Sequence, residues 1–227
     1  MAALLLRLPS SNGSAPLRHF PAVGRNASRP TLLPSKPAAF ASPVPRLRPR
    51  AASASSLSSM ETPPDGYRKN VGICLVNPSN KIFAASRLDV PDAWQMPQGG
   101  IDNDEDPVTA AVRELREETG VVSAEVLAEV PYWLTYDFPP EVKEKVNNLW
   151  GTNWKGQAQK WFLLRFTGKD EEINLAGDGT EAAEFGEWSW LPPQEIIDRA
   201  VRFKKPVYEE VLRFFAPHIQ FDANMAL

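Results

Sequence analysis

The stretch Arg-Glu-Leu-Arg-Glu-Glu-Thr-Gly at residues 113–120 constrains the fold of this chain more than any other, because it places three glutamates and two arginines within eight positions. Its upstream flank and its last residue carry helix signals. Asp106 is a favourable N-cap, Pro107 is tolerated at the first helical position, and Gly120 is a typical C-terminal stop. The sequence therefore predicts a helix from Asp106 to Gly120 whose second half is crowded with carboxylates.

On such a helix, residues three and four apart share a face, so Glu114, Glu117 and Glu118 should cluster. The neighbouring face is apolar and should turn toward the core; it consists of Val108, Val112 and Leu115. Two interpretations of the carboxylates are open: a solvated surface laced with ion pairs to the two arginines, or a cation site. Taken alone, the eight residues favour the solvated surface.

The residues upstream change this balance through their spacing. Gly99 lies six residues before Glu105, and Arg113 follows eight residues after Glu105. The complete pattern is G-x5-E-x7-R-E-U-x-E-E-x-G-U, where x is any residue and U is a bulky aliphatic residue. Every specified position is filled, by Gly99, Glu105, Arg113, Glu114, Leu115, Glu117, Glu118, Gly120 and Val121. This pattern resembles the Nudix box of the Nudix hydrolases.

The resemblance implies a divalent metal site that serves the hydrolysis of a nucleoside diphosphate linked to another group. Mg²⁺ and Mn²⁺ prefer carboxylate and carbonyl oxygens, and three glutamates on one helix face offer several. The implied ligands from the box are the carbonyl of Gly99 and the side chains of Glu114, Glu117 and Glu118. Glu105 and Arg113 should pair and tie the loop to the helix, a structural role like that of the helix stop at Gly120.

Two assignments within this site stay open. The catalytic general base is Glu114 by resemblance, and Glu118 is the alternative. The resemblance also implies a further carboxylate ligand from outside the box, for which Glu184 is favoured over Glu187.

The rest of the chain reads as short strands and helices in mixed order. Strands are expected at 71–76, 81–86, 124–130, 160–166 and 187–191, with a turn at 77–80 and a short extended piece at 94–100. Two further helices, each opened by proline, are expected at 192–201 and 206–215. This mixture favours an α/β fold, an α/β/α sandwich with a mixed sheet, which is also the fold that the resemblance implies.

Residues 1–60 differ from the rest, because they contain seven arginines and one lysine but no aspartate or glutamate. An acid-free N-terminus rich in Arg and Ser is typical of an organelle transit peptide, which does not fold alone. Its mixture of Arg, Ser, Ala and Pro favours a chloroplast, with a mitochondrion as the alternative. We therefore expect a disordered transit peptide at 1–60 and a Nudix hydrolase domain at 65–218.

Composition limits the partners of the remaining chain. The whole chain has 25 basic and 28 acidic residues, and subtracting the eight basic residues of 1–60 leaves 17 basic against 28 acidic. A general nucleic-acid coat requires a basic surface, so nucleic acid is not expected as a partner, except RNA at its 5′ end.

No apolar run approaches the roughly 18 residues of a membrane span. The single Cys74 excludes an internal disulfide and is expected to be a buried strand residue. The expected partner is a small nucleotide, and no feature bears on oligomeric state.

Outside the box, the chain resembles the plant asymmetric diadenosine tetraphosphate hydrolases in the segments 66–75, 94–101, 130–139, 156–166, 172–175, 183–190 and 203–208. The same framework is shared with bacterial RNA pyrophosphohydrolases. The resemblance implies that Tyr136 and Phe203 stack a base between their rings. It also implies that cationic side chains hold phosphate oxygens. These cations are Arg68, Arg87, Lys160 and Lys205, with Lys204 as the alternative to Lys205.

The expected activity is hydrolysis of diadenosine tetraphosphate to ATP and AMP with Mg²⁺ or Mn²⁺. A second enzymatic hypothesis is pyrophosphate removal from triphosphorylated RNA ends, guanosine tetraphosphate or other nucleoside diphosphate derivatives. A third, from a different class, is a non-catalytic nucleotide-binding module. The intact Glu114, Glu117 and Glu118 argue against that third hypothesis.

Overall fold

The computed structural model describes residues 62–176, 179 and 182–219, so the transit peptide expected at 1–60 lies outside the described residues. The strands are β1 (Tyr67–Val76), β2 (Ile82–Arg87), β3 (Trp94–Gln95), β4 (Gln98–Gly100), β5 (Ala124–Glu129), β6 (Leu134–Asp137), β7 (Gly156–Phe166) and β8 (Phe185–Leu191). The helices are α2 (Pro107–Thr119), α3 (Pro140–Trp150), α4 (Pro193–Arg199) and α5 (Lys205–Phe215), with a 3₁₀ turn η1 (Asp170–Glu172). Each helix of the described part is too short or too polar to span a bilayer.

The strands form one mixed sheet. β1 pairs in parallel with β7 along its whole length, in register from Tyr67 opposite Gly156 to Val76 opposite Arg165. All other pairings are antiparallel: β2 and β4 lie against β1, β5 and β6 against β7, and β3 and β8 against β2. The turn expected at 77–80 joins β1 to β2, which pair as a hairpin, and β7 lies inside the sheet between β1 and β5.

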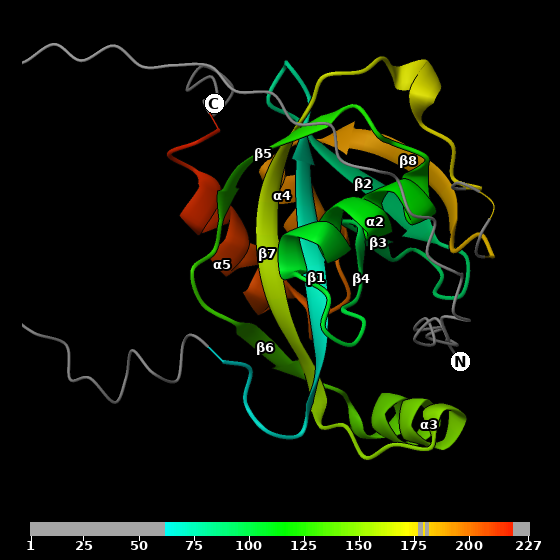
Figure 1. Ribbon diagram of the computed structural model, residues 1–227. Coiled ribbons are helices and arrows are strands. Elements are labelled where there is room, and N and C mark those ends of the chain that lie inside the picture. The colour runs from blue at the N-terminus through cyan, green and yellow to red at the C-terminus, as the bar shows by residue number, and fades with distance from the viewer. Residues whose placement is uncertain (1–61, 177–178, 180–181, 220–227) are drawn as a thin grey trace, which may run out of the picture. The chain divides into compact units, whose positions relative to one another are not determined.

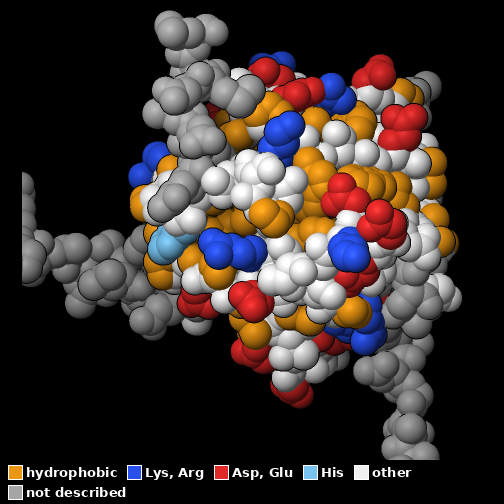
Figure 2. All heavy atoms as spheres, turned by 90° about the horizontal axis from the view of Figure 1, so that it is seen from above, with side chains coloured by type: hydrophobic (Ala, Val, Ile, Leu, Met, Phe, Trp, Pro, Cys, Tyr) orange, Lys and Arg blue, Asp and Glu red, His pale blue; other side chains and the backbone are white. Residues whose placement is uncertain are grey.

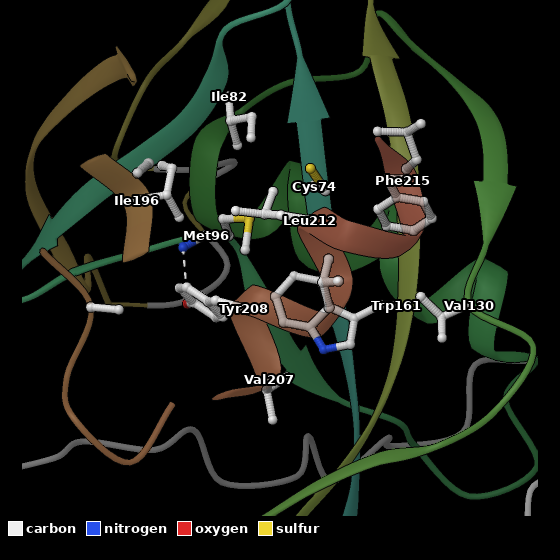
Figure 3. Close-up of a cluster of buried hydrophobic side chains, with 14 of the residues drawn as sticks. Cys74, Ile82, Met96, Val130, Trp161, Ile196, Val207, Tyr208, Leu212 and Phe215 are labelled. Carbon is white, nitrogen blue, oxygen red and sulfur yellow. Dashed lines mark hydrogen bonds between the residues drawn. The ribbon is translucent and has the colours of Figure 1, made fainter. Parts of the chain in front are cut away.

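The sheet lies between two helical layers. Alternate residues of a strand face opposite sides, and both faces of the central strands carry apolar side chains that helices cover. On one side, Ile73 of β1 packs in a cluster with Leu115 of α2. On the other, Cys74 of β1 and Trp161 of β7 pack with Tyr208 of α5, as Figure 3 shows. In Figure 1, α2 covers the front of β1 and β7, and α4 and α5 lie behind the sheet. The expected α/β/α sandwich is confirmed, and Cys74 is the buried strand residue that its sequence context predicted.

The helix signals of α2 act as expected. The carboxylate of Asp106 accepts a hydrogen bond from the backbone N–H of Thr109 at 3.2 Å. Gly120 adopts a left-handed conformation with φ of 71°, and its N–H donates to the carbonyl of Arg116. A residue with a side chain would be strained at that φ, so glycine ends the helix here at low cost.

The expected core face of α2 is partly wrong. Val112 is 47% exposed, whereas Ala110 and Ala111 are buried against the sheet. The carboxylates are not solvated either, since Glu114 and Glu118 are only 2% and 3% exposed. Small alanines let the helix approach the sheet closely, and this brings the glutamate face toward β4.

Helix α3 and strand β6 were not expected from the sequence. Pro139 is the N-cap of α3, Pro140 is its first residue, and Gly151, with φ of 63°, ends it. Only Val146 of this helix is fully buried. Figure 1 shows α3 beyond the N-terminal ends of β1 and β7. The apolar residues of α3 are Val142, Val146, Leu149 and Trp150, which recur at helical spacing, so the sequence did carry a signal for this helix.

Some apolar side chains reach the surface. Leu88, Val122 and Leu149 are each more than half exposed. Figure 2 shows hydrophobic side chains interspersed with charged groups over one face. Scattered exposed apolar residues are normal on a folded protein and require no partner to explain them.

Candidate active site

Arg113 organises the carboxylates of α2. Its guanidinium donates to both oxygens of Glu105, at 2.9 and 2.8 Å, and to the carbonyl of Gly100 at 2.9 Å. Its Nη1 also donates to Glu114 at 2.9 Å and to Glu117 at 3.1 Å. The hydrogen bond with Glu105 is the main cause that raises the pKa of Arg113 and lowers that of Glu105. Arg113 thus contacts Glu105, as the sequence suggested, and also neutralises two glutamates of the helix.

Glu114 and Glu118 are held against β4. A methyl group at Gly99 would lie 1.8 Å from Cδ of Glu114 and about as close to both of its oxygens, so the carboxylate fills the space where a side chain would be. The backbone N–H of Gln98 donates to Glu118 Oε2 at 3.0 Å. Carboxylates are rarely buried unless paired. A cation bound beside them would therefore be strongly favoured.

The donor set fits a hard divalent cation in chemistry, but the side chains are not gathered into a cage. Within residues 62–176, 179 and 182–219, no three Asp, Glu, His or Cys side chains are close enough to enclose an ion. Instead, Arg113 holds the carboxylates of Glu114 and Glu117. Carboxylate and carbonyl oxygens are the ligands that Mg²⁺ and Mn²⁺ prefer. A carboxylate has two oxygens, so the contact with Arg113 does not by itself prevent Glu114 or Glu117 from coordinating a cation.

Glu184, expected as a further ligand, is ion-paired with Arg87. Glu184 Oε2 lies 2.5 Å from Arg87 Nη1, and Asp89 Oδ1 lies 2.7 Å from Arg87 Nε. The pKa of Arg87 is raised overall. Burial lowers it, but the contacts with Asp89 and Glu184, and to a smaller extent the charge of Glu118, outweigh that effect. The structure therefore pairs the residue expected to bind metal with one expected to bind phosphate, close to the α2 carboxylates.

Lys204 is buried beside β3 and β4. Its Nζ donates to Gln95 Oε1 at 2.9 Å and to Gln98 Oε1 at 3.1 Å. Burial, assisted by the charge of Arg87, lowers its pKa to about 7, although Glu184 and Glu118 oppose the shift. Gln98 links Lys204 to the carboxylates, because its backbone N–H donates to Glu118.

The other two lysines lie differently. Lys205 Nζ donates to the carbonyl of Asp198 at 2.9 Å, so it caps the end of α4. Lys160 is half-buried in β7 opposite Val71. Of the adjacent pair 204 and 205, the structure therefore favours Lys204 as the cation beside the carboxylates.

Tyr136 and Phe203 contact each other. Their ring centroids are 5.5 Å apart, with the rings tilted by 38°. Tyr136 is buried, and its hydroxyl donates to Gln157 Oε1 at 2.6 Å. Two rings in contact leave no room for a base between them, so a base could enter only if the rings moved apart.

A buried amide network next to Lys204 was not expected from the sequence. Gln159 Nε2 donates to Asn70 at 2.8 Å and approaches the carbonyl oxygens of Gln98 and Gln157 at 3.3 Å. Nε2 of Gln95 and of Gln157 is buried and donates to no described residue. Such donors can satisfy the oxygens of a ligand. The sequence signal that could have found them is the density of glutamines at 95–98 and 157–159.

Arg68 lies on the opposite flank of the carboxylates. Its guanidinium is 4.5 Å from the ring centroid of Trp150. Its Nη2 lies 2.4 Å from the position of a methyl group on Gly100. Burial lowers the pKa of Arg68, while the charge of Glu114 opposes that effect. A half-buried guanidinium beside Glu114 is suited to bind an anion that also contacts the carboxylate site.

The free energy of unfolding should depend on pH through Lys204. Its folded-state pKa of about 7 lies below the ordinary 10.5, so between these values the unfolded chain binds a proton that the folded chain lacks. Stability from this group therefore rises with pH across that window. From pH 7 to pH 9, the wild type should gain about 2–3 kcal/mol relative to Lys204→Met. Urea unfolding of both proteins measures this change, and a difference that is constant with pH contradicts it.

Comparison with known proteins agrees with this geometry. A family model described as the NUDIX domain matches residues 66–211. The chain is 65% identical over 193 residues to "Nudix hydrolase 26, chloroplastic" of Arabidopsis thaliana, covering 82% of this chain and 89% of that protein. It is 51% identical over 156 residues to an RNA pyrophosphohydrolase of Cereibacter sphaeroides, covering 67% and 93%.

Among solved structures, the E. coli dihydroneopterin triphosphate pyrophosphohydrolase has the same fold. Its TM-score is 0.53 at 14% identity, covering 66% of this chain and 98% of that one. The match of the family model to most of the described chain and the identity to full-length relatives lead to one conclusion. The chain is a member of the Nudix hydrolase family.

Proposed function

We propose that the chain hydrolyses dinucleoside polyphosphates asymmetrically, with diadenosine tetraphosphate giving ATP and AMP. The observation that carries the proposal is the alternation of charge around β4. Arg113 contacts Glu114 and Glu117, and Arg87 contacts Glu184. Lys204 bonds the side chain of Gln98, whose backbone N–H bonds Glu118. Such a site can neutralise a divalent cation and several linked phosphates at the same time.

Nudix hydrolases generally need a divalent metal ion. The residues that would hold Mg²⁺ or Mn²⁺ are Glu114, Glu117 and Glu118 with the carbonyl of Gly99, and Glu184 as a further ligand. When bound, such an ion supplies neutralisation of the polyphosphate and activation of the attacking water.

The chain's own residues do the remaining work. Glu114, or Glu118 in its place, accepts the proton of the attacking water. The water oxygen forms a bond to the phosphorus atom that is retained in AMP. The bridging P–O bond on the opposite side breaks, and its oxygen leaves with ATP. Arg68, Arg87 and Lys204 hold the phosphate oxygens in line for this displacement. Positioning and charge neutralisation account for most catalysis of this kind.

A second candidate is removal of pyrophosphate from triphosphorylated RNA ends. It is favoured by the 51% identity to a protein named RNA pyrophosphohydrolase. The same carboxylates and cations would act on the 5′ triphosphate. The excess of acidic residues after residue 60, 28 against 17 basic, weighs against binding a long RNA. We therefore rank the small dinucleotide substrate first.

A product assay tests the ranking. The full chain is offered diadenosine tetraphosphate, guanosine tetraphosphate and a 5′-triphosphate RNA, each with Mg²⁺ and with Mn²⁺. Equal amounts of ATP and AMP, and the highest kcat/KM on diadenosine tetraphosphate, are expected. Equal or greater efficiency on the RNA reverses the ranking.

We also propose that the protein acts in the chloroplast. The acid-free residues 1–60 and the 65% identity to a protein named chloroplastic support this location. A reporter fused to residues 1–60 should enter chloroplasts. A mitochondrial or cytosolic signal would exclude the proposed location.

A further inference from the structure

Arg68 and Trp150 form a stacked pair that joins β1 to the end of α3. The guanidinium carbon of Arg68 lies 4.5 Å from the centroid of the Trp150 ring. Arginine prefers such positions over aromatic faces, and the attraction is larger when the pair is removed from water. The contact brings a side chain from α3 to the edge of the carboxylate site.

Arg68 has a position that demands external support. Its Nη2 occupies the space above Gly100, where a methyl group would lie only 2.4 Å away. Burial lowers the pKa of Arg68, because the charged guanidinium loses part of its hydration, and the negative charge of Glu114 partly compensates that loss. A long side chain with several rotatable bonds needs packing on its other face to stay in one conformation.

Helix α3 gives Trp150 a fixed place. Asn147 accepts hydrogen bonds from the Thr152 hydroxyl at 2.9 Å and the Trp154 N–H at 2.8 Å, and it donates to the Trp154 carbonyl at 3.0 Å. These bonds fix the turn that follows Trp150. Near the start of β1, the Tyr67 hydroxyl donates to Asp137 at 2.5 Å. The two segments that carry Arg68 and Trp150 are therefore each tied down close to the pair.

The indole nitrogen of Trp150 adds a second observation. Nε1 is buried and donates to no residue that the structure describes. A buried N–H without an acceptor is costly, so packing against Arg68 and α3, rather than a hydrogen bond, holds the indole in place.

We propose that Trp150 is a positioning residue that holds the Arg68 guanidinium, through stacking, for the phosphate oxygens of the substrate. This inference rests on the proposed function in taking a polyphosphate as the ligand. Helix α3 then determines affinity for the polyphosphate chain and leaves the hydrolytic step to the carboxylates of α2. Trp150→Leu should raise KM and leave kcat nearly unchanged.

Binding of inorganic tripolyphosphate, measured by calorimetry in Mg²⁺, separates phosphate positioning from base stacking, because this probe has no base. Loss of a cation–π contact should weaken binding roughly five- to tenfold in Trp150→Leu. Trp150→Phe keeps an aromatic face and should recover most of that loss. Leu149→Ala, at the exposed neighbour on the same helix, should bind like the wild type.

A double-mutant cycle excludes a merely structural effect. In the Arg68→Ala background, Trp150→Leu should cause no further loss of tripolyphosphate affinity. An equal loss in both backgrounds, or a loss for diadenosine tetraphosphate alone, overturns the inference. If the wild type hydrolyses no dinucleoside polyphosphate but shows this coupling, the proposed function fails and the positioning role stands.

Discussion

Glu118→Gln and Glu117→Gln should each lower kcat on diadenosine tetraphosphate by roughly three orders of magnitude. Each change removes one negative charge from the proposed metal site. The fold should survive, because glutamine has the same shape and its carbonyl can still accept the N–H of Gln98 that Glu118 accepts at 3.0 Å. Burying a neutral amide at position 118 also costs less than burying a carboxylate.

The matched control is Glu125→Gln, the same change at an exposed glutamate of β5. It should retain wild-type kinetics. Steady-state rates at saturating Mg²⁺ and urea unfolding of all variants make the comparison. Near-normal turnover by either the 117 or the 118 variant would rule out the proposed ligand set.

Gly99→Ala should reduce kcat at least a hundredfold while costing only about 1–2 kcal/mol of stability. The new methyl group would lie 1.8–2.1 Å from the carboxylate atoms of Glu114, so that carboxylate must leave its place over β4. The backbone at this position can accept alanine, because the φ angle of Gly99 is not positive. Gly99→Ala should therefore lower kcat strongly and the free energy of unfolding only slightly.

Glu114→Ala provides the background that tests this cause. Once the carboxylate is gone, Gly99→Ala has nothing to displace and should cause no additional loss of kcat. A further large loss in that background would show that the methyl group disturbs something other than Glu114. Unfolding curves of the four proteins show whether stability contributes.

The helix α2 illustrates what local chemistry predicts well. The N-cap at Asp106, the proline at position 107 and the left-handed Gly120 are each satisfied within a few residues. Their outcome depends little on the rest of the fold, so the helix and its ends followed from the sequence. The spacing of Gly99, Glu105 and Arg113 likewise predicted which side chains meet.

Other features depend on contacts between distant segments. Val112 was expected in the core and is 47% exposed, because α2 turns Ala110, Ala111 and Leu115 toward the sheet instead. Helix α3 has apolar residues at helical spacing but fully buries only Val146, so its place in the fold depends on the contacts of its neighbours. Lys204 and Lys205 are adjacent in the chain, and only the path of α5 decides that the first is buried and the second caps α4.

The sequence by itself determined the family, the carboxylate helix and the mixed α/β architecture, because these depend on fixed spacing and on hydrophobic patterns. Only the tertiary structure decided the partners of the charged groups. It paired Glu184 with Arg87, placed Lys204 among buried glutamines and stacked Arg68 on Trp150. The physical reason is that the state of a buried charge depends on its surroundings from every element, and those surroundings come from segments that the chain brings together only by folding.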